Sequence, residues 1–159
     1  MSAHRFEFRT IKGEALPLSQ FEGRAVLVVN TASRCGFTPQ YRELQGLWER
    51  YRARGLVVIG VPSNDFGAQE PGTEAEILEF CEVNYDIDFP LTAKEAVIGE
   101  EAHPFYKWVA EVGGESAAPR WNFHKYLIGP EGELVNVYSS KVSPLSAELV
   151  NEIEALLGA

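Results

Sequence analysis

Residues 25–39 have the sequence AVLVVNTASRCGFTP, which joins an apolar run to a cysteine and then to the start of a helix. The run Ala25–Asn30 is almost continuously apolar, which predicts a strand buried on both faces. Thr38 is a good N-cap and Pro39 fits a first helical turn, so we expect a helix to begin there. Cys35 therefore lies between the end of a strand and the N-terminus of a helix.

This placement predicts a nucleophilic thiol. The positive end of the helix dipole faces Cys35, and the neighbouring Arg34 adds a formal cation. Both favour the thiolate over the thiol, and the thiolate is the reactive form of cysteine.

A βαβ unit surrounds this cysteine. Apolar residues recur at helical spacing from Tyr41 to Tyr51, and Gly55 is expected to end that helix. Leu56–Val61 predicts a second buried strand, parallel to the first and joined to it by a right-handed crossover.

The remaining patterns complete an α/β fold. Thr73 and Glu76 form a capping box for a helix that carries Cys81. Further elements are expected at 6–9 and 16–18 (a hairpin), 89–91 (a short strand), 103–112 (a helix), 123–128 and 133–139 (a hairpin), and 149–157 (a helix). We predict a single domain over residues 1–159, with a central mixed β-sheet flanked by helices on both faces.

Composition excludes several classes of function. The net charge of -9 argues against nucleic-acid binding and against stable association with anionic membranes. No apolar run reaches about 18 residues and the N-terminus has no secretory pattern, so we expect a cytoplasmic protein. The two cysteines then belong to a reducing compartment, where a thiol is more often redox-active than structural. The three histidines lie far apart in the sequence, so no metal site and no cofactor are expected.

The residues after Cys35 indicate which kind of substrate its thiolate attacks. Cys35 to Thr38 is a Cys-x-x-Thr sequence, so no second thiol lies next to the first and a lone nucleophile is expected. A peroxide suits such a thiolate, and the product is a sulfenic acid. Neutral N–H donors around the sulfur and the leaving oxygen are needed, and 62–72 and 120–126 contain Asn, Gln and Trp side chains that could supply them.

Three blocks of this chain resemble the glutathione peroxidase family: Asn30–Thr38, Phe66–Gly72 and Trp121–Leu127. They occur in the family's order, and the likeness extends over nearly the whole chain. The resemblance implies a thioredoxin-like fold, in agreement with the α/β pattern.

The resemblance also implies roles for single residues. Cys35 matches the peroxidatic residue, and Gln69, Trp121 and Asn122 match the other members of the family's catalytic tetrad. Cys81 matches the resolving cysteine of thioredoxin-dependent members. Thr31, Arg34 and Asp65 depart from residues that are common in the family.

Cys81 has a second interpretation as a small buried hydrophobe, because Ile77 lies one turn earlier on the same helix face. If Cys81 resolves, it must form a disulfide with Cys35, which requires Cα atoms within about 7 Å. A cysteine held in a capped helix would reach that distance only by local unwinding, so we expect this helix to melt partly during turnover.

The sequence therefore predicts a thiol peroxidase of hydrogen peroxide and organic or lipid hydroperoxides, recycled by thioredoxin and acting in oxidative stress defence. A glutathione-dependent peroxidase with a structural Cys81 is one alternative, and a peroxide sensor or redox relay is another. A thiol–disulfide oxidoreductase is disfavoured because no Cys-x-x-Cys occurs. The segment between Val112 and Trp121 is short where tetrameric members carry an insertion, which predicts a monomer or loose dimer with an open site.

Overall fold

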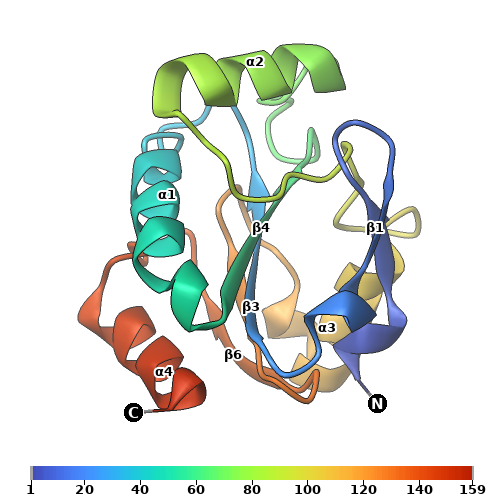
Figure 1. Ribbon diagram of the computed structural model, residues 1–159. Coiled ribbons are helices and arrows are strands. Elements are labelled where there is room, and N and C mark those ends of the chain that lie inside the picture. The colour runs from blue at the N-terminus through green and yellow to red at the C-terminus, as the bar shows by residue number, and fades with distance from the viewer. Residues whose placement is uncertain (1, 159) are drawn as a thin grey trace.

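The computed structural model describes residues 2–158 and consists of a four-stranded sheet with helices on both faces (Figure 1). The strands are β1 (Glu7–Arg9), β2 (Ala15–Pro17), β3 (Ala25–Thr31), β4 (Leu56–Pro62), β5 (Lys125–Ile128) and β6 (Leu134–Tyr138). The helices are α1 (Gln40–Tyr51), α2 (Glu74–Tyr85), α3 (Pro104–Gly113) and α4 (Ala147–Leu157), with short 3₁₀ turns at Ala3–Arg5, Leu18–Phe21, Arg52–Arg54 and Glu115–Ala117.

The main sheet has the strand order β4-β3-β5-β6. β3 and β4 are parallel, from Ala25 opposite Leu56 to Thr31 opposite Pro62, while β5 runs antiparallel to both β3 and β6. β1 and β2 form the separate hairpin that the sequence predicts. The sheet is therefore mixed, as expected.

Every residue of β3 and β4 is buried, because both faces of the sheet are covered. Leu27 and Val29 belong to a core shared with α1 and α4, whereas Val26 and Val28 belong to a second core shared with α3 and the β1–β2 hairpin. Figure 1 shows α1 and α4 on one side of the sheet and α3 on the other. The α/β prediction with helices on both faces is confirmed.

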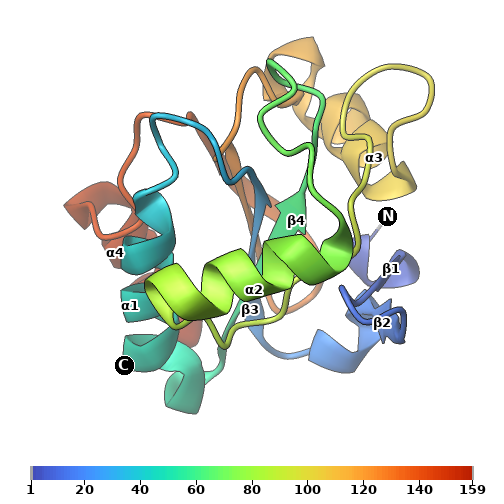
Figure 2. The same cartoon turned by 90° about the horizontal axis from the view of Figure 1, so that it is seen from above.

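α2 lies apart from these layers, across the end of the sheet where β3 and β4 finish (Figures 1 and 2). Its start is the predicted capping box: the Thr73 hydroxyl accepts from the Glu76 N–H, and the Glu76 carboxylate accepts from the Thr73 N–H. These bonds satisfy two of the free N–H groups at the helix N-terminus.

The strand predicted at 89–91 is wrong. Only isolated bridges form here, from Leu91 to Gly60 and from Thr92 to Thr10. The Pro90 carbonyl accepts from the Gly60 N–H (3.0 Å). Because Pro90 has no N–H of its own, it cannot donate the next bond, and the ladder does not continue toward Phe89.

None of the helices within residues 2–158 is long and apolar enough to cross a membrane.

Candidate active site

Cys35 lies in a tight turn that follows β3 directly. The Cys35 N–H donates to the Thr38 hydroxyl (2.9 Å), and that hydroxyl donates to the Ala32 carbonyl (2.9 Å). The Phe37 N–H points at the Cys35 sulfur, at 3.3 Å. The side chain of Thr38 thus closes the loop around the thiol, which is 8% exposed.

This arrangement corrects the predicted start of the helix. Pro39, not Thr38, is the N-cap residue of α1, and it makes no side-chain hydrogen bond there. The Thr38 side chain instead bonds within the cysteine turn, because a threonine hydroxyl can bond to nearby backbone groups in a turn as well as at a helix N-terminus.

The loop after β4 brings Gln69 beside the cysteine turn. The Arg34 N–H donates to the Gln69 carbonyl (3.1 Å), which joins the two loops through their backbones. The chain reaches this position through two residues with positive φ, Gly67 (68°) and Ala68 (52°). A Cβ at Gly67 would lie 3.1 Å from the Trp121 ring, so glycine permits the close approach of this loop to the indole.

The segment before β5 supplies the third part of the site. The Asn122 side-chain amide is fully buried and donates to the Gln69 side-chain oxygen (3.0 Å). Asn30, at the end of β3, donates through its side chain to the Trp121 carbonyl (2.9 Å) and accepts from the Phe123 N–H (2.6 Å). Phe123 has φ of 65°, an uncommon conformation for a non-glycine residue that turns the chain into β5.

A buried lysine that the sequence analysis did not single out holds this turn. Lys125 is 0% exposed, and its ammonium donates to the carbonyls of Phe123 (2.7 Å) and Ser140 (3.5 Å). Burial lowers the pKa of Lys125 to about 7, and the Glu43 carboxylate offsets part of this effect. The sequence held one signal of this burial, a lysine next to the apolar residues of the predicted strand 123–128.

These bonds bring the three sequence blocks, Asn30–Thr38, Phe66–Gly72 and Trp121–Leu127, to one end of the sheet. The turn after β3, the loop after β4 and the segment before β5 lie side by side there, and α2 crosses the same end (Figure 2). Carboxyl ends of neighbouring parallel strands are the usual place for sites in α/β folds. Cys35 and the side-chain amides of Gln69 and Asn122 therefore lie at the same end of the sheet. Neutral amide donors suit a reaction in which a leaving oxygen gains negative charge.

Cys81 lies on α2, the helix that crosses this end of the sheet, and belongs to the same hydrophobic core as Cys35. It is 0% exposed, and both it and Cys35 are free thiols. Burial raises the pKa of the Cys81 thiol to about 12; the nearby Tyr41 hydroxyl offsets part of this rise, and the charge of Glu70 adds to it. In this state Cys81 is a protonated, enclosed thiol.

The histidines have structural surroundings. His103 is the N-cap of α3, where its ring accepts from the Phe105 N–H and stacks on Phe8. Burial lowers the pKa of His124 to about 4, so its ring is neutral at physiological pH. Across residues 2–158, no group of three or more His, Cys, Asp or Glu side chains could hold a metal ion.

Asp65, one of the departures noted in the sequence, has a structural role. Its carboxylate accepts from the backbone N–H groups of Val97 (2.6 Å) and Ile98 (3.2 Å), which ties the loop after β4 to a distant segment.

Comparison with known proteins agrees with this geometry. The model of the glutathione peroxidase family matches residues 3–110. The chain is 45% identical to a glutathione peroxidase homolog, BsaA, of Halalkalibacterium halodurans, covering 99% of this chain and 100% of that protein. It is 43% identical to the glutathione peroxidase-like peroxiredoxin gpx1 of Schizosaccharomyces pombe, over 91% of this chain and 92% of that one.

Solved structures extend the likeness to three dimensions. The crystal structure of Trgpx in apo form superposes with a TM-score of 0.80 at 31% identity, covering 99% of this chain and 95% of that one. A thioredoxin family protein of Chlorobium tepidum, at 16% identity and a TM-score of 0.72 over 99% of this chain and 97% of that one, shares the fold alone.

The fold is thus thioredoxin-like, and the family likeness makes the protein a thiol peroxidase. The chain belongs to the glutathione peroxidase family.

Proposed function

We propose that Cys35 attacks hydroperoxides, with Gln69, Trp121 and Asn122 as its catalytic partners. The observation that carries this assignment is the bond from Asn122 to Gln69, on a loop that is itself bonded to the residue before Cys35. The Cys35 thiolate bonds to one oxygen of ROOH, the O–O bond breaks, and the leaving alkoxide takes a proton to become ROH. Cys35 is then a sulfenic acid.

Neutral donors support this step in a specific way. The leaving oxygen gains negative charge as the O–O bond breaks, and preorganised N–H groups stabilise such charge without reorganising. The Gln69 amide is oriented because its oxygen already accepts from Asn122, which leaves its NH₂ group free to face the reaction. The half-buried Trp121 can donate through its indole N–H.

We further propose that Cys81 resolves the sulfenic acid. The Cys81 thiol attacks the Cys35 sulfur, an S–S bond forms, and water leaves. Thioredoxin then reduces the disulfide by thiol–disulfide exchange and restores both thiols. The packing of α2 supports this role. It buries only Ile77 and Cys81 of its 12 residues, whereas α1 buries six of its 12, so fewer buried contacts oppose local unwinding of α2.

The alternative with glutathione as reductant is favoured by a different observation. Cys81 is completely buried in the hydrophobic core, as a structural cysteine would be. In that case glutathione attacks the sulfenic acid directly, and Cys81 takes no part. A redox relay uses the same two thiols and differs in passing the disulfide to a specific protein partner.

We also propose a cytoplasmic protein that acts as a monomer or loose dimer on hydrogen peroxide and on bulky organic or lipid hydroperoxides. The two free thiols suit a reducing compartment, and the short segment from Val112 to Trp121 supports an open site.

The test compares wild type with Cys81→Ser, using thioredoxin and glutathione in turn as reductant. We expect Cys81→Ser to reduce one equivalent of peroxide at the wild-type rate but to lose steady-state turnover with thioredoxin. Full thioredoxin-dependent turnover of the variant would refute the resolving role, and efficient turnover of both proteins with glutathione would establish the alternative.

Hydrogen exchange tests the motion. Oxidation should accelerate amide exchange across 73–85, because the disulfide requires α2 to unwind. Unchanged exchange in this segment after oxidation would count against unwinding. A lasting mixed disulfide with one partner protein, in place of rapid peroxide consumption, would favour the relay.

A further inference from the structure

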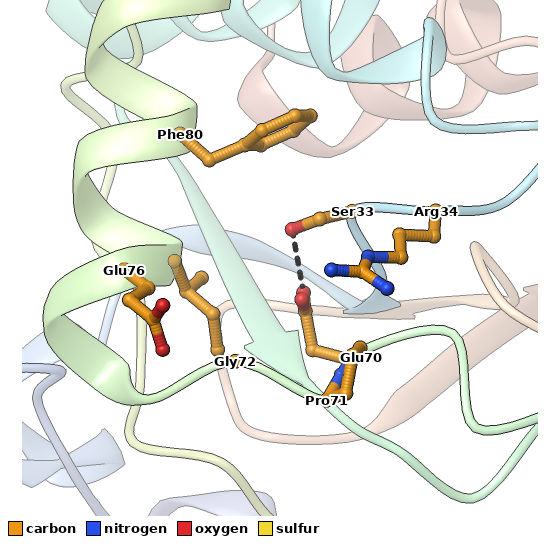
Figure 3. Close-up of a pocket in the computed structure, with 8 residues that line it drawn as sticks. Ser33, Arg34, Glu70, Pro71, Gly72, Glu76 and Phe80 are labelled. Atoms are coloured by element: carbon orange, nitrogen blue, oxygen red, sulfur yellow. Dashed lines mark hydrogen bonds between the residues drawn. The ribbon is translucent and has the colours of Figure 1, made fainter.

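A small cavity separates the loop that carries Cys35 from α2. Its volume is about 150 Å³; Ser33 and Arg34 line it from the loop, and Ile77 and Phe80 line it from the helix (Figure 3). Cys81 follows Phe80 directly. Loosening of α2 beside this cavity would therefore release the Cys81 thiol next to the cysteine loop.

The carboxylate of Glu70 lies in the wall of this cavity. It is 1% exposed, and it accepts from the Ser33 hydroxyl (3.0 Å), the contact drawn in Figure 3. The Glu70 N–H donates to the Asn64 side chain (2.9 Å), so the residue is held at both its backbone and its side chain. A buried carboxylate is rare without a full set of partners, and it commonly serves a function.

The surroundings of Glu70 favour a proton acceptor. Burial raises the pKa of Glu70, and the hydrogen bonds from Ser33 and the charges of Lys94 and Arg34 offset part of that rise. A carboxylate with a raised pKa is a stronger base than an exposed one.

The resolving step requires such a group. A thiol must lose its proton to attack a sulfenic acid, and Cys81 holds its proton tightly in the closed helix. Glu70 lines the same cavity as Ile77 and Phe80, the residues one turn before Cys81 and directly before it on α2. It also lies on the loop that the Gln69 carbonyl joins to the cysteine turn, and its carboxylate accepts from Ser33 of that turn.

We propose that Glu70 is the general base of the resolving step, an inference that rests on the proposed resolving role of Cys81. As α2 loosens, the Glu70 carboxylate takes the proton from the Cys81 thiol. The thiolate attacks the Cys35 sulfur; the S–S bond forms and the S–O bond breaks. The proton passes to the departing oxygen, which leaves as water, so the Cys35 sulfur is reduced and the Cys81 sulfur is oxidised.

The negative charge of Glu70 serves both states. While α2 is closed, burial keeps the Cys81 thiol protonated, and the charge of Glu70 adds to this effect. Once Glu70 has accepted the proton it is neutral and no longer repels the thiolate that it has produced. The same residue therefore suppresses premature reaction and promotes resolution after opening.

The experiment follows two steps separately after one equivalent of hydrogen peroxide is added to the reduced protein. Trapping with dimedone measures formation of the sulfenic acid, and alkylation of the remaining thiols followed by mass spectrometry measures formation of the disulfide. We expect Glu70→Gln to form the sulfenic acid at the wild-type rate and the disulfide about 10²-fold more slowly. The matched control is Glu79→Gln, which removes an exposed carboxylate from α2 and should match wild type in both steps.

A second variant guards against a failure of Glu70→Gln to fold. In Glu70→Ala the missing side chain leaves space beside the cavity, and added acetate should restore disulfide formation in proportion to its concentration. No acetate rescue would overturn the assignment, as would equal disulfide rates in Glu70→Gln and wild type. Failure of wild type itself to form the disulfide is a separate result, which would refute the resolving role of Cys81 and the inference with it.

Discussion

The two thiols of this protein occupy regions of opposite character. Cys35 lies in a turn held by hydrogen bonds within the turn and joined to the loop after β4. Cys81 lies on a helix whose inner face is thinly packed: α1 buries six of its 12 residues, but α2 buries two of its 12. Both thiols are buried, so exposure alone does not distinguish them.

The difference fits the two proposed roles, peroxidatic for Cys35 and resolving for Cys81. A peroxidatic thiol needs donors that stay in place while charge moves, and the strand ends of a packed sheet provide this. A resolving thiol needs to travel, and a surface helix of low local stability provides that. The most informative experiments alter one region and observe whether the other responds.

Replacement of the first thiol should have the largest effect. Cys35→Ser removes the nucleophile, and we expect peroxide consumption to fall by at least about 10³-fold. The Cys81 thiol should not compensate, because it is enclosed and protonated. Steady-state peroxide assays measure the loss, and residual activity that disappears on Cys81 alkylation would show that the two regions are less distinct than their surroundings suggest.

The second largest effect should come from the hydrogen bond between Asn122 and Gln69, which holds the loops around Cys35 together. Asn122→Ala removes the donor to Gln69, and we expect sulfenic acid formation to slow by about 10²-fold. Stability should fall by about 1 kcal/mol, because the half-buried Gln69 oxygen loses its partner. Stopped-flow oxidation and urea unfolding measure the two effects, and Asn151→Ala on the exposed face of α4 is the control. An unchanged oxidation rate would remove Asn122 from the site.

The buried Lys125, which holds the turn before β5, should make the stability of the protein depend on pH. Its pKa is lowered from 10.5 to about 7 in the folded protein, so the unfolded chain binds more protons between these values. Stability contributed by Lys125 therefore rises as the pH increases through this window. Relative to Lys125→Met, wild type should gain about 2 kcal/mol in free energy of unfolding from pH 7 to pH 9. Parallel stability curves for the two proteins across this range would contradict the assignment of a neutralised buried lysine.

The cap of α2 offers the smallest and most selective change. Thr73→Ala removes the hydroxyl that accepts from Glu76, which costs about 1 kcal/mol of helix stability. Amide exchange in α2 should accelerate about fivefold, and disulfide formation should accelerate with it if opening limits that step. Sulfenic acid formation at Cys35 should not change. Faster exchange without faster disulfide formation would show that opening of α2 is not limiting.

Most of the fold could be predicted from local pattern. The apolar runs of β3 and β4, the capping box of α2 and the turn between β5 and β6 each depend on residues close together in the sequence, so they form where the sequence indicates. The errors have a common cause. The Thr38 hydroxyl bonds to the backbone of Cys35 and Ala32 and not to the first turn of α1, and Pro90 interrupts a ladder whose other strand is distant in the sequence.

The candidate site divides in the same way. Cys35, Gln69, Trp121 and Asn122 could be proposed from three sequence blocks, since each block contains its reactive side chain and the turn that presents it. The buried positions of Glu70 and Lys125 could not be proposed, because a charged residue in a sequence is most often exposed. Only packing against distant elements reveals that these two charges are enclosed.

The sequence alone determined the nature of the chemistry: a lone thiol at a strand end, neutral donors in two other blocks, and a second thiol on a capped helix. These are properties of residue type and local spacing. The tertiary structure decided which groups meet, because the Gln69–Asn122 bond, the cavity beside α2 and the burial of Glu70 all join segments far apart in the chain. Such contacts depend on how the sheet and helices pack, and no local pattern specifies them.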